Sequence, residues 1–276
     1  MRTTTNPATL EDKRIRVLQR FQELGSVLVA LSGGVDSAVV AALAYEALKS
    51  QAVAVTFESP LTPPEEIEDA RKVAQTIGIE HQVSPLDELK IAAVALNPRN
   101  RCYHCKLLRF RQAQVTAMKL GISAVADGST VSDESEHRPG LQAIEELGII
   151  SPLREAGITK TESRQLAHQY RLPVADKPSN SCLATRIPYG ETLTPTRLSR
   201  IAAAETIVRA KVEGAIVRVR DHGTVARIEV PREKIPVLLS EPVATELIGE
   251  LTDLGYEHIC VDLQGYRFGS FDEESG

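Results

Sequence analysis

The sequence predicts an α/β fold, a parallel sheet with helices on both faces, followed by a smaller α+β domain. Three observations support this. Short apolar runs alternate with helical segments over roughly the first 130 residues, as in successive βαβ units. A turn rich in glycine and serine directly follows the first apolar run. After about residue 190 a hairpin pattern replaces the alternation, so we expect domains at 1–190 and 191–276.

The elements of the first domain follow from their periodicity. Residues 10–24 have the pattern of an amphipathic helix, and residues 26–31 form an apolar run suited to a buried strand. The segment 63–78 begins with prolines and acidic residues and ends at Gly78, as helices do. Further helices are expected at 37–50 and 104–120, and further strands at 52–57, 79–84 and 122–127.

The second domain begins with a helical pattern at 195–212. Apolar and polar residues then alternate on both sides of 221–223, which predicts a hairpin. Two short helices and a last strand at 258–263 complete the chain.

The composition excludes several classes of protein. The chain has 276 residues and a net charge of −5, whereas proteins that dock on a long phosphate backbone are usually basic. We see no secretory signal, and no run approaches the roughly 20 apolar residues that span a bilayer. Four cysteines are too few for a disulfide scaffold. We therefore expect a cytoplasmic protein without a nucleic-acid or membrane partner.

The turn SGGVDS, residues 32–37, has the features of a phosphate loop. Gly33 and Gly34 allow the backbone to approach an anion closely, and the next helix would offer unpaired N–H groups. Ser32 and Ser37 add hydroxyl donors. Asp36 fits an anion site only if a cation bridges it to the phosphates, and Mg²⁺ would do so.

SGGxDS after a strand resembles the PP-loop of ATP pyrophosphatases, which split ATP between the α and β phosphates and adenylylate an oxygen of their substrate. Asp127 and Gly128 follow the fourth expected strand, and ligands bind at the carboxyl ends of such strands. The resemblance implies that this segment closes over the adenylate. The alternative is that Asp127 only caps a turn.

The cysteines divide into two kinds. Cys260 lies in an apolar strand pattern and is expected in the core. Cys102 and Cys105 form a CxxC in a basic, polar segment ahead of a helix, and Cys182 lies in a loop near Arg186. Basic surroundings favour thiolates, the form that binds metals. A zinc site, a redox dithiol, a [4Fe–4S] cluster on three cysteines and an incidental pair all remain open, because spacing does not rank them.

Over almost its whole length the chain is similar to the LarE family, ATP-dependent sulfur transferases of nickel-pincer nucleotide biosynthesis. The most specific motifs are RIPYG within 181–194 and VRVR…ARIE within 217–231. Further matches lie at 32–37, 126–128, 137–141, 163–173, 202–208 and 255–269.

The resemblance implies adenylylation of a carboxylate of pyridinium-3,5-biscarboxylic acid mononucleotide, followed by replacement of the activated oxygen by sulfur. One branch of the family sacrifices a cysteine. The other binds a [4Fe–4S] cluster with three cysteines, for which Cys102, Cys105 and Cys182 qualify. Sacrifice of Cys182 is the alternative.

The resemblance also implies ATP and Mg²⁺ as cofactors and a homo-hexamer. It places Arg218, Arg220 and Glu205 at the substrate phosphate, and Ser59, Lys106 and Arg186 beside the nucleotide. A tRNA thiolase, an amide-forming PP-loop ligase and a binding module without activity are the competing interpretations. The acidic balance opposes the first, and a thiol triad has no use in the second.

Overall fold

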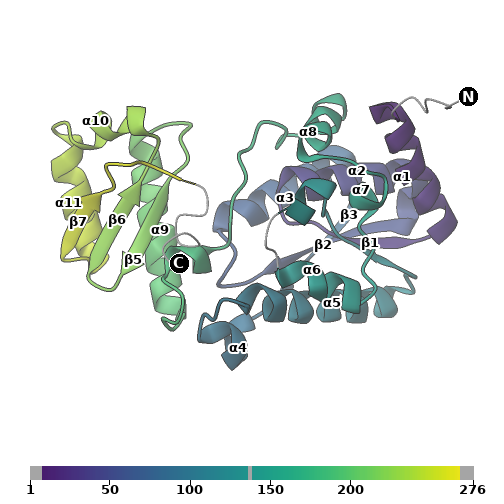
Figure 1. The fold of residues 1–276 in the computed structure, drawn as a ribbon, viewed down its shortest axis with the longest axis horizontal. Helices are drawn as coiled ribbons and strands as arrows, with labels where there is room; N and C mark the ends of the chain where they lie inside the picture. Colours follow the sequence, from purple (N-terminus) through teal and green to yellow (C-terminus); the bar gives the residue numbers. More distant parts are fainter. Residues whose placement is uncertain (1–7, 136–138, 268–276) are drawn as a thin grey trace, which may run out of the picture. The chain divides into compact units, whose positions relative to one another are not determined.

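The computed structural model describes residues 8–135 and 139–267 (Figure 1). The chain forms two compact units that interleave along the sequence. Unit 1 contains Met1–Ser59, Pro64–Leu86 and Cys102–Asn180, and unit 2 contains Pro60–Pro63, Asp87–Arg101 and Ser181–Gly276. The boundary expected near residue 190 thus lies inside unit 2, and the division into domains stays a prediction.

Backbone hydrogen bonds explain why two short early segments join unit 2. The N–H of Leu183 donates to the carbonyl of Leu61 at 2.9 Å. The N–H of Leu193 donates to the carbonyl of Ala95 at 2.8 Å. Pairings between residues this far apart in the sequence leave no local signal in it.

The sheet of unit 1 confirms the predicted parallel α/β arrangement. It consists of β1 (Val27–Ala30), β2 (Ala52–Glu58), β3 (Glu80–Pro85) and β4 (Val125–Ala126) in the order β3-β2-β1-β4, and every neighbouring pair is parallel. β4 is shorter than the apolar run at 122–127 suggested, because only its two residues pair with β1.

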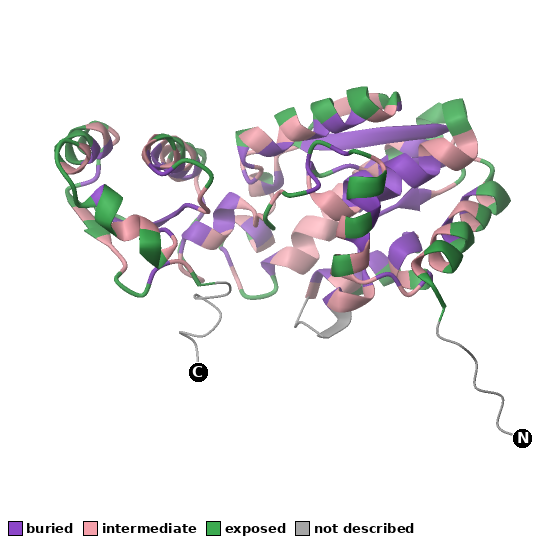
Figure 2. Cartoon of the chain, turned by 90° about the horizontal axis from the view of Figure 1, so that it is seen from above, coloured by how far each residue is buried: buried purple, intermediate pink, exposed green. Residues whose placement is uncertain are grey.

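Helices cover both faces of this sheet, as predicted. Val29 and Ala54 face one core with α1 (Leu10–Leu24), α2 (Val35–Leu48), α3 (Pro64–Ile77) and α8 (Lys160–Gln169). Leu28 and Val53 face the other core with α5 (Arg101–Leu120) and α6 (Pro139–Glu146). Neighbouring strand residues point to opposite faces, and in β1 and β2 the residues on both faces are apolar, so these two strands are largely buried (Figure 2), whereas β3 is half-buried.

One boundary in unit 1 matters for the site. α5 begins at Arg101 rather than near residue 104, so Cys102 and Cys105 lie one turn apart at the start of this helix and not in a preceding loop. The remaining elements of this unit are η1 (Lys49–Gln51), η3 (Val131–Ser135) and α7 (Pro152–Glu155).

Unit 2 contains a three-stranded mixed sheet. β5 (Arg218–His222) is antiparallel to β6 (Val225–Glu229), and β6 is parallel to β7 (His258–Val261). The predicted hairpin is present, with Asp221 inside β5. Its helices are α4 (Ala92–Ala95), α9 (Pro195–Lys211), α10 (Ile235–Leu238) and α11 (Val243–Asp253), with short turns η2 (Glu88–Lys90), η4 (Leu183–Arg186) and η5 (Arg232–Lys234).

The two faces of the hairpin differ in chemistry. Val219, Ala226 and Ile228 pack in the core of unit 2 with residues of α9 and α11. Arg218 and Arg220 alternate with Val219 and therefore share the opposite face. The sheet thus separates an apolar core from a face that carries charge.

The prediction that Cys260 is a core residue is wrong, because its side chain is exposed. β7 is an outer strand of its sheet, in which Ile259 and Val261 turn inward and Cys260 turns outward. In the described ranges, we find no helix with the length and apolarity needed to cross a membrane.

Candidate active site

The phosphate loop joins β1 to α2, as the sequence predicted. Gly34 is the N-cap of α2 and has an extended backbone. The Ser37 hydroxyl donates to the Gly34 carbonyl at 3.0 Å, and the backbone N–H of Ser32 donates to the Ser37 oxygen at 3.1 Å. These bonds close the loop around the first turn of the helix, whose N-terminal N–H groups favour an anion.

Two glycines in this region are required by close approach. Gly33 has φ of 81°, and a Cβ there would lie 2.1 Å from the Glu66 carbonyl oxygen. A Cβ on Gly128 would lie 2.7 Å from the Ser37 nitrogen. The loop is therefore packed between α3 and the segment after β4, as a site at the carboxyl ends of parallel strands requires.

Asp36 is held in an environment that disfavours its negative charge. Burial raises the pKa of this carboxyl above its ordinary 3.8, and the charge of Asp133 adds to the effect. The Ser163 hydroxyl and the charges of Lys160 and Arg164 act against it. A carboxylate in such a place is stabilised by a cation, so its chemistry fits the Mg²⁺ predicted from the sequence.

The side chain of Asp127 is engaged in local structure. Its Oδ1 accepts from the Ser151 hydroxyl at 2.7 Å and from the Ser129 N–H at 3.2 Å. It therefore shapes the turn that brings Gly128 against the phosphate loop. This is the turn-capping role that the sequence left open, and a contact with the adenylate stays a prediction.

Two further predicted residues lie on the α5 side of unit 1. Ser59 follows β2, and its hydroxyl accepts from the Arg109 guanidinium at 3.2 Å. The Lys106 side chain passes the first turn of α6, where a Cβ on Gly140 would lie 2.7 Å from Lys106 Cδ. The absence of a side chain at Gly140 therefore leaves room for the Lys106 side chain.

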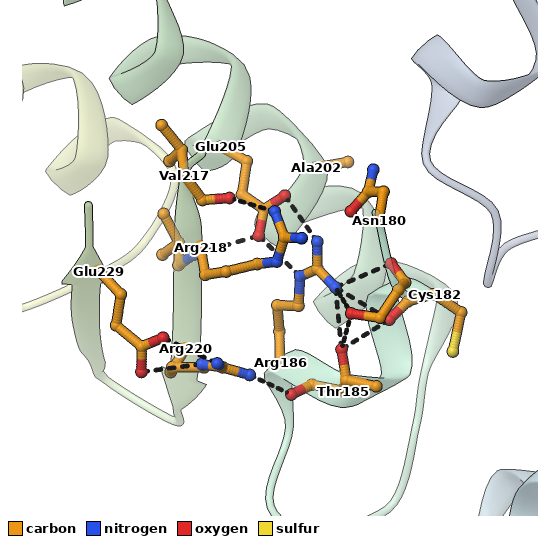
Figure 3. A network of polar contacts seen from close by, with 12 residues as sticks. Asn180, Cys182, Thr185, Arg186, Ala202, Glu205, Val217, Arg218, Arg220 and Glu229 are labelled. Carbon is orange, nitrogen blue, oxygen red and sulfur yellow. Dashed lines mark hydrogen bonds and ion pairs between the residues drawn. The ribbon is translucent and has the colours of Figure 1, made fainter. Parts of the chain in front are cut away.

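Arg186 is fully buried in unit 2 and fastens the loop that carries Cys182 (Figure 3). It forms a bidentate ion pair with Glu205, with N–O distances of 2.7 and 3.1 Å. Its other end donates to the carbonyls of Ser181 at 2.9 Å and Cys182 at 3.1 Å, and to the Thr185 hydroxyl at 2.8 Å. The structure thus gives Arg186 a role in holding this loop, and its expected contact with the nucleotide stays a prediction.

Arg220 also forms a bidentate ion pair, in this case with Glu229. It donates to both oxygens of Glu229, at 3.0 and 2.7 Å, and to the Thr185 carbonyl at 2.7 Å. Glu229 also receives Arg227 at 3.4 Å. Arg220, Arg227 and Glu229 share one face of the hairpin, so the buried carboxylate is enclosed by guanidinium groups.

Arg218 lies on the same face and donates to the Val217 carbonyl at 2.8 Å. Its guanidinium lies 5.2 Å from the centre of the Tyr266 ring. Burial, followed by the nearby positive charge of Arg186, lowers the pKa of Arg218 to about 10. The surroundings of Arg218 therefore disfavour its positive charge, and a bound anion would stabilise it.

The three cysteines of the predicted triad are half-buried thiols. Cys102 and Cys105 belong to unit 1 and Cys182 to unit 2. No group of three or more potential metal ligands gathers within residues 8–135 and 139–267. The donor set fits an iron–sulfur cluster by its chemistry, since thiolates are the usual ligands of such clusters.

Sequence reasoning missed a second group of charged residues under the phosphate loop. Lys177 contacts the Gly33 carbonyl and the carboxylates of Glu66 and Asp69. Asn180 also binds Glu66, at 2.9 Å. The only signal was a lysine in the proline-containing segment ahead of Cys182, which does not reveal its partners.

Comparisons with known proteins place the chain. The family described as NAD synthase matches residues 13–107, a range that contains the phosphate loop. An uncharacterized protein of Synechocystis sp. is 41% identical over 263 residues, 95% of this chain and 98% of that protein. Pyridinium-3,5-bisthiocarboxylic acid mononucleotide synthase of Lactiplantibacillus plantarum is 34% identical over 268 residues, 96% of each chain.

A more distant relative is the tRNA-specific 2-thiouridylase of Rickettsia typhi. It is 31% identical over 195 residues, which cover 57% of this chain and 54% of that protein. The parallel sheet and the phosphate loop define an ATP-dependent enzyme of the PP-loop class. Within this class the chain belongs to the LarE family, because its similarity to the L. plantarum synthase extends over nearly the whole of both proteins.

Proposed function

We propose that the protein is an ATP-dependent sulfur transferase that acts on pyridinium-3,5-biscarboxylic acid mononucleotide. The observation that carries this proposal is the 34% identity to the L. plantarum synthase over 96% of each chain. In the proposed reaction, a substrate carboxylate attacks the α phosphate of ATP and pyrophosphate leaves. Sulfide then displaces AMP from the acyl adenylate, which leaves a thiocarboxylate.

The phosphate loop would serve the first step. The N–H groups at the start of α2 and the hydroxyls of Ser32 and Ser37 would bind the phosphates. Asp36 would hold Mg²⁺, which neutralises charge on the leaving pyrophosphate. The raised pKa of Asp36 supports this role, because burial leaves the carboxylate in need of a positive partner.

The charged face of unit 2 would hold the phosphate of the mononucleotide. Arg218 and Arg220 both project from β5 to this face, and guanidinium groups suit phosphate oxygens. Glu205 would act indirectly, since it orients Arg186 beside them. Support comes from the lowered pKa of Arg218, which marks positive charge that an anion would stabilise.

For the second step, Cys102, Cys105 and Cys182 would hold a [4Fe–4S] cluster, which when bound would supply the sulfur-delivery chemistry. The chain's own contribution is to position the thiols. Cys102 and Cys105 are fixed at the start of α5, one turn apart, and Arg186 holds the backbone of Cys182. We also propose a homo-hexamer from the family resemblance, which light scattering of the purified protein would test.

The cluster is tested by comparing Cys182→Ser with Cys260→Ser. Anaerobically purified wild-type protein and Cys260→Ser should contain iron and sulfide, because Cys260 is an exposed residue of β7 and is not one of the three proposed ligands, whereas Cys182→Ser should lose them. Intact mass after turnover tests the alternative. Loss of the mass of H₂S at Cys182 in active, iron-free protein would establish sacrifice of this cysteine instead.

The overall function is tested by product analysis. With ATP and the mononucleotide, the wild-type protein should release AMP and pyrophosphate and form a thiocarboxylate. Release of ADP would contradict the proposed chemistry. The similarity to the R. typhi thiouridylase makes tRNA the second candidate substrate, and tRNA thiolation without reaction of the mononucleotide would favour it.

A further inference from the structure

The ammonium group of Lys177 connects three segments of unit 1. Its Nζ lies 2.8 Å from Glu66 Oε2, 2.8 Å from Asp69 Oδ2 and 3.1 Å from the Gly33 carbonyl oxygen. The side chain is only 17% exposed. An ammonium group has three N–H donors, so these three acceptors can use all of them.

The contact with Gly33 fixes the orientation of one peptide group in the phosphate loop. The bond between Gly33 and Gly34 is trans, so its carbonyl and the N–H of Gly34 point in opposite directions. With the carbonyl held by Lys177, the N–H must point away from Lys177. It points toward the Ser32 hydroxyl at 3.4 Å, which is the inner side of the loop.

The support under this peptide is rigid. Gly33 lies against the first turn of α3, since a Cβ there would be 2.1 Å from the Glu66 carbonyl oxygen. The Glu66 side chain is bound on both oxygens, by Lys177 and by Asn180. Lys177 is therefore paired with a carboxylate that is itself held in place by a second contact.

The charges around Lys177 also matter for an anionic ligand. Glu66 and Asp69 place two carboxylates directly behind the phosphate loop. The ammonium group offsets part of this negative charge, which would otherwise repel a polyphosphate in the loop. Orientation of the peptide and compensation of the carboxylates are separate effects, and they can be separated by mutation.

We propose that Lys177 is a positioning residue for ATP, which holds the Gly33 carbonyl so that the Gly34 N–H faces the bound polyphosphate. The proposal rests on the proposed use of ATP by the phosphate loop. The three contacts of Lys177 are all with the protein, so its proposed effect on ATP passes through the peptide between Gly33 and Gly34.

The test compares Lys177→Met with the triple variant Lys177→Met/Glu66→Gln/Asp69→Asn. The single variant should lose both thermal stability and ATP affinity, because it leaves the buried carboxylate of Glu66 and the half-buried carboxylate of Asp69 without their shared cation. In the triple variant neutral amides replace both carboxylates. No unpaired negative charge remains, so the thermal stability should recover. Its ATP affinity should stay about tenfold weaker than in the wild type, while its adenosine affinity is unchanged.

Lys72→Met is the matched control, because Lys72 lies 4.0 Å from the same Asp69 but is 57% exposed on α3. It should bind ATP like the wild type. Wild-type ATP affinity in the triple variant would overturn the proposal and reduce Lys177 to a counter-ion.

A measurement on the wild-type protein covers the case in which the variants do not fold. The amide resonance of Gly34 in ¹⁵N-labelled protein should shift with Mg-ATP and not with adenosine, and an unmoved resonance would also overturn the proposal. Failure of wild-type protein to bind ATP or release pyrophosphate would instead refute the proposed function.

Discussion

Substitution of Arg218 by glutamine should weaken binding of the mononucleotide without weakening the fold. Burial and the charge of Arg186 lower the pKa of Arg218 from 12.5 to about 10. A pKa change of one corresponds to about 1.4 kcal/mol. The folded protein therefore disfavours the charged guanidinium by on the order of 3 kcal/mol before any anion binds. Glutamine removes this cost, along with a contact to the Tyr266 ring worth about 1 kcal/mol.

The same change at Arg220 should have a different effect. Arg220 forms a bidentate ion pair with Glu229, a residue that is only 1% exposed. Breaking a buried pair from one side costs about 3–5 kcal/mol, and the remaining contact of Glu229 with Arg227 at 3.4 Å favours the lower end. Arg220→Gln is therefore expected to lower the melting temperature clearly, while Arg218→Gln leaves it unchanged or slightly raised.

Ligand binding should separate the two effects. Loss of one charge-assisted phosphate contact, about 1.5–3 kcal/mol, corresponds to a roughly ten- to hundredfold weaker affinity. Calorimetric titration with pyridinium-3,5-biscarboxylic acid mononucleotide should show this loss in Arg218→Gln, with ATP affinity unchanged as the internal control. Equal loss of stability in both variants, or full affinity in Arg218→Gln, would refute the reasoning.

Three further predictions concern single residues. Burial holds the pKa of Asp36 in the folded protein above 3.8, so the contribution of this carboxyl to stability falls as pH rises from 3.8 through the folded value. Asp36→Asn should therefore abolish pyrophosphate release, yet in thermal melts at pH 7 it should be at least as stable as the wild type. Burial and then Arg71 hold the folded pKa of His81 below 6.5, so stability should be complete above pH 6.5 and decline as pH falls toward the folded value; melts across this range should show a shallower decline in His81→Gln. Asp221 is fully buried and binds Arg197 and Arg200, so Asp221→Asn should lose about 3–5 kcal/mol in urea unfolding, and an unchanged midpoint would argue against a stabilising role.

Periodicity predicted the strands of the parallel sheet and the helices α1, α2, α3, α5 and α9, because each is encoded in local sequence, but it did not predict α4, α6, α7 or α8. It was less able to place ends. The polar residues around Cys102 suggested a loop, but polarity does not prevent a helix from starting at Arg101. Cys260 shows an avoidable error, since the alternation of Ile259 and Val261 with their neighbours already indicated a strand with one outward face.

The candidate site was only partly accessible from the sequence. The phosphate loop is contiguous, so its glycines and Asp36 could be recognised directly. The support beneath it could not, because Lys177 reaches a carbonyl 144 positions earlier in the chain. The buried partners of Arg186 and Arg220 were equally hidden, since a sequence does not show which arginines of a basic strand face a carboxylate.

The interleaving of the two units has a consequence for how this protein can be divided. The backbone passes from one unit to the other at five places, after residues 59, 63, 86, 101 and 180. A fragment that begins at Ser181 would lack the carbonyls of Leu61 and Ala95 that receive hydrogen bonds from Leu183 and Leu193. Division of the chain at a single junction would therefore leave both fragments incomplete, so neither unit can be exchanged as one continuous segment.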